Sequence, residues 1–258
     1  MGTKNTILNT ALDLFFPVSC YCCRQPKHEA LNPLGILCSE CWAKIFLNEW
    51  IFCPVCNKKL AHQNPPGSGE NRSVCLNHLS CLKWLGVASN YNDKILKPLI
   101  WEYKYGLNES LAEVFSGIMF QYFEKISSQI LLDKNNLAAQ AGTVLSFIPL
   151  ASKRLRWRGF NQAKLLAQGL AQKTGLVVVD SLERKAYSLP QMSLETKKQR
   201  FQNIKNSFGA RNQKEICGKD IVLVDDVCAT GATLIEAART LRRAGAKNIY
   251  GLVLARKL

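Results

Sequence analysis

The sequence predicts an α/β fold in which a parallel sheet is flanked by helices, preceded by an N-terminal zinc-ribbon-like domain. Two short runs, 143–148 and 221–224, are apolar without polar alternation, as in strands buried on both faces of a parallel sheet. Apolar residues at helical spacing separate and follow these runs. Nine of the eleven cysteines lie between residues 20 and 81. We therefore expect a cysteine-rich, zinc-binding domain over residues 1–85 and an α/β domain over residues 86–258.

The composition is that of a basic globular protein. Of its 258 residues 47% are hydrophobic, and 34 Lys and Arg against 19 Asp and Glu give a net charge of +15. Such an excess suits nucleic acid, phosphorylated ligands or an acidic partner. No run of 18 or more apolar residues occurs, so no membrane span is predicted. Because Asp13 interrupts the apolar part of the N-terminus, we expect no export signal and a cytoplasmic protein.

The first cysteines have the spacing of a metal site. Without an export signal, metal ligands are favoured over disulfides, because cytosolic thiols are kept reduced. The pairs Cys20-x-x-Cys23 and Cys38-x-x-Cys41 are separated by 14 residues, which suits a tetrahedral zinc site with four cysteine ligands. Cys22 is left over and is an alternative to its neighbour Cys20.

A second metal site begins with the pair Cys53-Pro-Val-Cys56. Its other ligands come from three residues spaced by two each, Cys75, His78 and Cys81. We expect Cys81 together with either Cys75 or His78, and we take Cys75 as the ligand of choice. Four protein ligands leave no open coordination position, so both zinc ions are predicted to be structural.

The second domain alternates between predicted helices and strands. Residues 85–105 are predicted as a linker ending in a helix that begins near Pro98, because proline is tolerated in a first helical turn. A longer amphipathic helix follows over about 111–126. Beyond the strand 143–148, we expect a helix, a short strand and a final strand at 164–175, 176–179 and 248–254.

The most basic segment of the chain follows the strand 143–148. Two aromatic residues, Trp157 and Phe160, lie among its positive charges. Four cationic residues fall within six positions: Lys153, Arg154, Arg156 and Arg158. In isolation this pattern is typical of a single-stranded nucleic-acid surface. The segment is predicted as a loop that leaves the carboxyl end of a strand. It could therefore also receive a pyrophosphate at that edge of the sheet.

The strand 221–224 ends in two carboxylates, Asp225 and Asp226, followed by small residues. Ligands of open α/β sheets bind at the carboxyl ends of the strands. A helix is predicted from about Thr233 to the terminating Gly245, so its free N–H groups and positive dipole end point into the small-residue loop. A phosphate suits this loop, whose residues are Val227, Cys228, Ala229, Thr230, Gly231, Ala232 and Thr233.

Two carboxylates beside a phosphate loop need other partners. Ionised carboxylates only accept hydrogen bonds, and sugar hydroxyls can donate them. A 5′-phosphorylated ribose satisfies both halves of the motif. The stretch IVLVDDVCATGAT resembles the PRPP-binding motif of the type I phosphoribosyltransferases, which is an apolar strand, two acidic residues and a T-G-x-T loop. Ala229 departs from that pattern, because many members have threonine there.

Further motifs resemble one family more closely. A zinc-binding N-terminus, the segment P-x-x-x-x-R-x-x-x-R-G-F-N-Q and the DDVCATGAT loop are similar to the ComF/GntX family. Other residues that match its motifs in order are Arg184, Gln191, Arg200 and Asn203. The resemblance implies a type I phosphoribosyltransferase-like protein linked to natural competence, the uptake of single-stranded DNA, or to the use of external DNA.

The resemblance also implies roles for individual residues. Asp225 and Asp226 would hold ribose hydroxyls and magnesium-linked water, and the loop would hold the 5′-phosphate of PRPP. Arg154, Arg158 and Gly159 would face the pyrophosphate, with Arg158 stabilising its departure. A polar segment, 188–200, has the polarity of a mobile loop that closes over the sugar, and a fixed surface helix is the alternative for it. Two functions remain open: a phosphoribosyltransferase with an unknown acceptor, and a non-catalytic module that senses a nucleotide or binds single-stranded DNA and a translocating helicase.

Overall fold

The fold is built on one mostly parallel sheet. The computed structural model describes residues 19–25, 36–60, 75, 77–127, 142–185 and 204–257. Parallel pairing joins β3, β9, β8, β4 and β5, and an antiparallel pair, β1 and β2, extends the sheet beyond β3. In spatial order the strands are β2 (Lys59–Leu60), β1 (Ile51–Phe52), β3 (Leu82–Asn90), β9 (Asn248–Arg256), β8 (Asp220–Cys228), β4 (Thr143–Phe147) and β5 (Val177–Val178).

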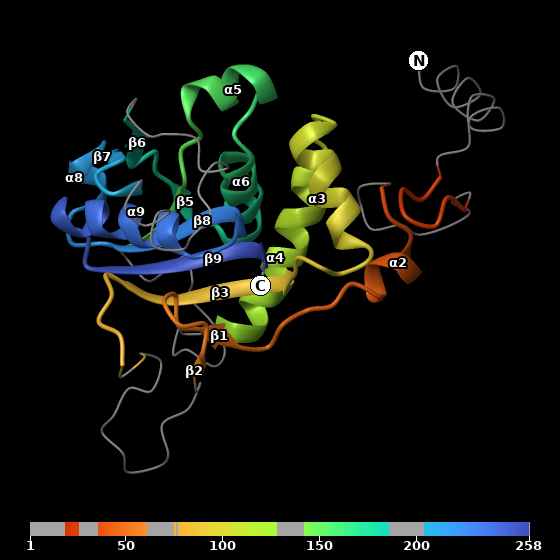
Figure 1. The fold of residues 1–258 in the computed structure, drawn as a ribbon, viewed down its shortest axis with the longest axis horizontal. Coiled ribbons are helices and arrows are strands. Elements are labelled where there is room, and N and C mark those ends of the chain that lie inside the picture. The colour runs from red at the N-terminus through yellow and green to blue at the C-terminus, as the bar shows by residue number, and fades with distance from the viewer. Residues whose placement is uncertain are drawn as a thin grey trace, which may run out of the picture.

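Helices cover both faces of this sheet (Figure 1). One face carries α3 (Leu96–Tyr105), α4 (Leu111–Ser127) and α6 (Gln162–Thr174), and the other carries α9 (Ala232–Arg243). A separate antiparallel pair, β6 (Leu182–Arg184) with β7 (Phe208–Ala210), packs on α9. The short helices are α2 (Ser39–Ala43), α5 (Ser152–Arg158) and α8 (Gln213–Ile216).

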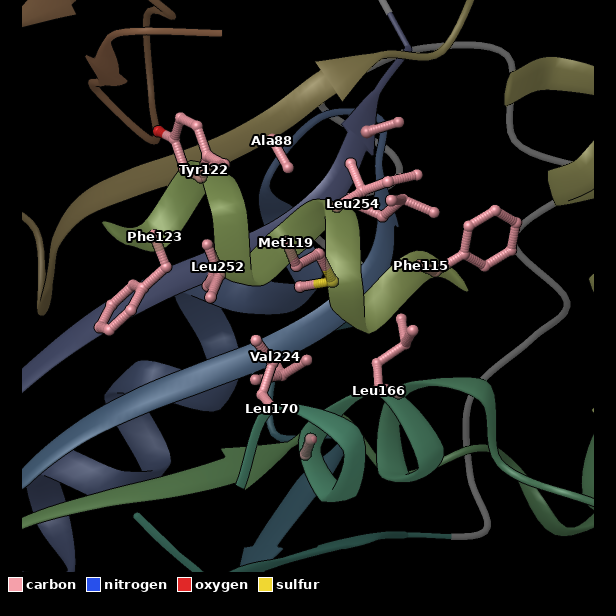
Figure 2. Close-up of a cluster of buried hydrophobic side chains, with 14 of the residues drawn as sticks. Ala88, Phe115, Met119, Tyr122, Phe123, Leu166, Leu170, Val224, Leu252 and Leu254 are labelled. Carbon is pink, nitrogen blue, oxygen red and sulfur yellow. The ribbon is translucent and has the colours of Figure 1, made fainter. Parts of the chain in front are cut away.

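Strand β8 is buried on both faces, as its apolar run predicts. Val222 and Val224 belong to the core under α4 and α6, whereas Ile221 and Leu223 belong to the core under α9. Figure 2 shows the first of these cores, in which α4 lies against the sheet and α6. The labelled side chains of α4 and α6 are Phe115, Met119, Tyr122, Phe123, Leu166 and Leu170.

Two elements differ from the sequence prediction. The prediction of a linker from residue 85 is wrong, because β3 runs from Leu82 and pairs with β9 in the middle of the sheet. Its small residue Gly86 breaks the apolar run, but a Cβ there would lie 3.1 Å from the Tyr122 ring, so the glycine lets this ring pack closely against the strand. Most of the basic segment is helix α5 rather than a loop.

The predicted boundary after residue 85 falls inside β3. The division into residues 1–85 and 86–258 stays a prediction, while β1 and β2 pair into the same sheet as the strands of the second part. Among the described residues, no helix is long and apolar enough to cross a membrane.

Candidate functional site

The small-residue loop joins β8 to α9 at the carboxyl edge of the parallel strands. Strand β8 continues through both aspartates to Cys228, because β9 pairs with it as far as Arg256. Gly231 is the N-cap of α9, with φ of +81°, a left-handed conformation that favours glycine. The Thr230 hydroxyl accepts a hydrogen bond from the Ala232 amide at 3.4 Å. The 12-residue helix therefore directs the N–H groups of its first turn into the loop.

The two aspartates lie in different surroundings. Asp226 is 9% exposed, and its Oδ2 lies 2.9 Å from Nζ of Lys104 at the end of α3. The amide of Asp226 donates to Oδ1 of Asp225 at 2.9 Å. Burial, together with the neighbouring charge of Asp226, raises the pKa of Asp225 to about 7. Asp225 thus lies next to a carboxylate that is paired with Lys104, and it loses its proton at a higher pH than an ordinary aspartate does.

Cationic side chains lie near the two aspartates. Arg158 ends α5, is 9% exposed, and donates from Nη1 to Oε1 of Gln162 at 3.2 Å. Arg184, on β6, has its pKa lowered by burial and by the charge of Arg154. Among the described residues, the buried Nε atoms of both Arg158 and Arg184 lack a hydrogen-bond partner. Buried donors without partners are costly to a folded protein.

These elements enclose two adjoining cavities. The larger, about 470 Å³, is lined by the loop, by Asp225 and by side chains of α3 and α5. The smaller, about 160 Å³, adds Asp226 and Arg184. Six residues line both cavities: Lys104, Arg154, Arg158, Asp225, Val227 and Thr233.

The structure brings most of the predicted site residues together here. Cys228, Ala229, Thr230 and Gly231 line the larger cavity, whereas Ala232 is buried behind it. Gly159 ends α5 with φ of +75° and lines neither cavity. The predicted segment 188–200, with Gln191 and Arg200, and also Asn203 lie outside the described residues.

The first cysteine set forms one cluster. The sulfur atoms of Cys20, Cys23, Cys38 and Cys41 all lie within 4.8 Å of one another, and those of Cys23 and Cys38 are 3.8 Å apart. A tetrahedral zinc site with bonds of about 2.3 Å separates its sulfurs by roughly 3.8 Å, so the residues fit the metal. Cys22 is exposed and lies outside this cluster.

The second cluster differs from the predicted ligand set in one residue. It comprises Cys53, Cys56, Cys75 and His78, with Cys75 Sγ 3.4 Å from His78 Nδ1. Cys81 is not part of it and packs against the core beneath α9. Cys75-x-x-His78 repeats the two-residue spacing of the other pairs, and the chain has already turned towards β3 when it reaches Cys81. Both clusters supply four protein ligands, as structural zinc requires.

The second cluster touches the loop. Pro54, between Cys53 and Cys56, presents its carbonyl oxygen to Gly231: a Cβ added at Gly231 would lie 2.6 Å from that oxygen. The residue at the middle of the loop is therefore packed against the backbone of a zinc knuckle.

Comparison with known proteins agrees with this two-part construction. A model of the phosphoribosyl transferase domain matches residues 157–258, and a model of the double zinc ribbon domain matches residues 11–77. The DNA utilization protein YhgH of Salmonella typhimurium is 29% identical over 245 residues, which cover 95% of this chain and 100% of the relative. Competence protein F of Haemophilus influenzae is 27% identical, over 94% of this chain and 98% of that one. The chain belongs to the ComF family.

Other comparisons are more distant. Competence protein ComFC of Bacillus subtilis is 26% identical to this ComF family chain, over 88% of it and 86% of the relative. Among solved structures, glutamine phosphoribosylpyrophosphate amidotransferase of B. subtilis has a TM-score of 0.38 and 20% identity, covering 59% of the ComF chain and 30% of its own.

Sequence reasoning missed Lys104 and Tyr105 as site residues of this ComF chain. Both lie at the end of α3, about 120 residues before the loop that they face. A lysine and a tyrosine at a helix end carry no local signal, and only the packing of α3 beside α5 brings them to the cavity. Arg184 was marked by the family motif, and the structure places it at the smaller cavity.

Proposed function

We propose that this ComF family chain binds PRPP, with its 5-phosphate on the loop from Ala229 to Thr233 and its ribose hydroxyls on Asp225 and Asp226. One observation carries the proposal: two adjoining cavities that share six lining residues bring together a helix N-terminus, a carboxylate pair and the side chains of Arg154, Arg158 and Arg184. Each of the three supplies one part of what a phosphorylated sugar with a pyrophosphate requires.

The charges of the site favour an anionic ligand despite the two aspartates. Lys104 neutralises Asp226 across 2.9 Å. Asp225, with its pKa near 7, carries only part of a charge at neutral pH. Arg154, Arg158 and Arg184 then leave a cationic excess for the pyrophosphate. Magnesium would enter with PRPP, since it is commonly held by one or two carboxylates plus substrate phosphates, and the aspartates supply such carboxylates.

Transfer of the ribose 5-phosphate to an acceptor is the reaction to which such a site lends itself. The bond from C1 to the pyrophosphate oxygen breaks, its electron pair leaves with the pyrophosphate, and a bond from C1 to the acceptor forms. Arg158 and its neighbours would stabilise the leaving pyrophosphate by charge. Pyrophosphate release in the presence of PRPP, magnesium and a panel of nucleobases distinguishes a transferase from a protein that only binds the ligand.

Calorimetry with PRPP and ribose 5-phosphate tests the binding itself. PRPP should bind more tightly than ribose 5-phosphate, and Asp226→Ala should weaken binding by about tenfold or more, since a lost hydrogen bond to a charged group costs roughly 1.5–3 kcal/mol. Asp220→Ala is the matched control, because Asp220 begins the same strand. It accepts a hydrogen bond from Asn248 at the amino-terminal end of β8, away from the loop. A wild-type protein that ignores PRPP would refute the proposal.

A second candidate is binding of single-stranded DNA, with or without a partner helicase. Its support is the charge: helix α5 carries Lys153, Arg154, Arg156 and Arg158 beside the exposed Trp157, and two relatives are named for competence and DNA utilization. Affinity for an oligonucleotide should fall steeply with salt, because each neutralised phosphate releases counterions. Binding that is absent at low salt, or insensitive to salt, would eliminate this candidate.

A further inference from the structure

Three exposed aromatic side chains gather beside the larger cavity, and two of them line it. Trp101 and Trp157 are each 60% exposed and Tyr105 is 44% exposed. The Tyr105 ring lies 5.5 Å from Trp101 and 5.8 Å from Trp157, centroid to centroid. The three come from α3 and α5, which project on the same side of the sheet (Figure 1). Neighbouring exposed aromatic rings, unlike a single one, commonly mark a binding surface.

Two of these rings belong to the wall of the larger cavity. Tyr105 and Trp157 line it together with the loop residues Thr230 and Thr233. The Arg158 guanidinium lies against both rings, 5.4 Å from the Tyr105 centroid and 5.9 Å from that of Trp157. The cavity of about 470 Å³ lies within the range of roughly 300–1,000 Å³ that small-molecule sites occupy. A phosphorylated sugar on the loop would leave the aromatic end open for a further group.

We propose that Tyr105 and Trp157, with Trp101 beyond them, form a stacking shelf for the purine or pyrimidine ring of a nucleotide whose 5′-phosphate occupies the loop. The inference rests on the proposed function, and it identifies the group bound beyond the sugar as a purine or pyrimidine base. A flat ring stacks on exposed aromatic faces without needing a hydrogen-bond pattern. Two rings of the shelf line the same cavity as the loop residues Thr230 and Thr233.

An apolar protein partner fits this surface less well. Such a partner would have to cover Lys104 and Arg154, which line the same cavity, and would strip water from their charges. A nucleotide instead places its phosphate on the loop and its ring on the aromatic faces, without covering these cations with an apolar surface. Sugar, phosphate and ring thereby each meet a wall of matching chemistry.

The test compares nucleoside 5′-monophosphates with ribose 5-phosphate, which share the phosphate and the sugar and differ by the base. Calorimetry should show at least one monophosphate binding roughly tenfold more tightly than ribose 5-phosphate to the full chain. Trp157→Ala should bring the ratio of the monophosphate affinity to the ribose 5-phosphate affinity down to about one, whereas Trp157→Phe should retain most of that ratio. Because Trp157 is largely exposed, neither substitution disturbs the core.

Trp50→Ala serves as the control, since Trp50 is 40% exposed and lines neither cavity; it should change no affinity. Equal affinity for every monophosphate and ribose 5-phosphate would overturn the shelf while leaving phosphate binding intact. An oligonucleotide that loses affinity in Trp157→Ala while the monophosphates do not would also overturn it, in favour of a strand-binding surface. Failure of both small ligands to bind would overturn the proposed function as well.

Discussion

Replacing Gly231 with alanine probes the contact between the small-residue loop, Val227 to Thr233, and the second zinc cluster. Gly231 has φ of +81°, and a Cβ there would lie 2.6 Å from the carbonyl oxygen of Pro54. Because Pro54 lies between two residues of the cluster, Cys53 and Cys56, its backbone cannot move aside without disturbing the knuckle. Either the loop or the knuckle must therefore shift.

The magnitude follows from two separate effects. A left-handed conformation disfavours alanine by about 1–2 kcal/mol. Overpacking against backbone adds about 1–3 kcal/mol, so Gly231→Ala should lower the free energy of unfolding by about 2–5 kcal/mol. Gly218→Ala is the matched control, because Gly218 has φ of +72° and no heavy atom within 4 Å of an added Cβ. It should show only the conformational part.

Urea unfolding and calorimetry with ribose 5-phosphate measure both consequences. Gly231→Ala should weaken ribose 5-phosphate binding by tenfold or more, whereas Gly218→Ala should leave the affinity unchanged. Equal destabilisation by the two substitutions, with unchanged affinity in both, would refute the idea that the loop is packed against the knuckle.

Two further predictions concern the acidic pair and the zinc. The pKa of Asp225 is raised to about 7 on folding, from 3.8, so the free energy of unfolding should fall as pH rises from about 4 to 7; Asp225→Asn should remove that fall, at most about 4 kcal/mol. Urea midpoints at pH 5 and pH 8 check this, and a difference between the two proteins that does not change with pH would contradict it. Elemental analysis should find two zinc ions per chain, and both Cys38→Ser and Cys56→Ser should lower the zinc content. Cys56→Ser should weaken ribose 5-phosphate binding and Cys38→Ser should not, since among the described residues it is the second cluster whose knuckle contacts the loop; equal weakening by both would contradict that contact.

The motif around the aspartates could be predicted because its signals are local. Four apolar residues without alternation specify a strand buried on both faces, and the structure places Ile221 and Val222 in different cores. The end of α9 could also be predicted, because Gly245 follows the C-cap with φ of +97°. Spacing likewise grouped the first four cysteine ligands, with Cys22 left as an alternative to Cys20, and the structure selects Cys20.

Strand β3 was missed because residues far away in the chain form the contacts that its polar groups need. Lys83, Gly86 and Ser89 interrupt the apolar run that marks a buried strand. The Ser89 hydroxyl donates to the Phe46 carbonyl, and the backbone amide of Val87 donates to the Tyr122 hydroxyl at 3.1 Å. These polar groups are satisfied only by tertiary partners, so the strand looked like a linker.

The contact at Gly231 links the second zinc cluster to the candidate site. A structural zinc site holds its own chain segment rigid, and here that segment includes the carbonyl against which the small-residue loop is packed. The knuckle is also tied to the sheet, because β1 ends next to Cys53 and pairs with β3. A loop braced on one side by α9 and on the other by a metal-held knuckle loses little conformational entropy when a phosphate binds. Pre-organisation of this kind raises affinity without adding a contact to the ligand.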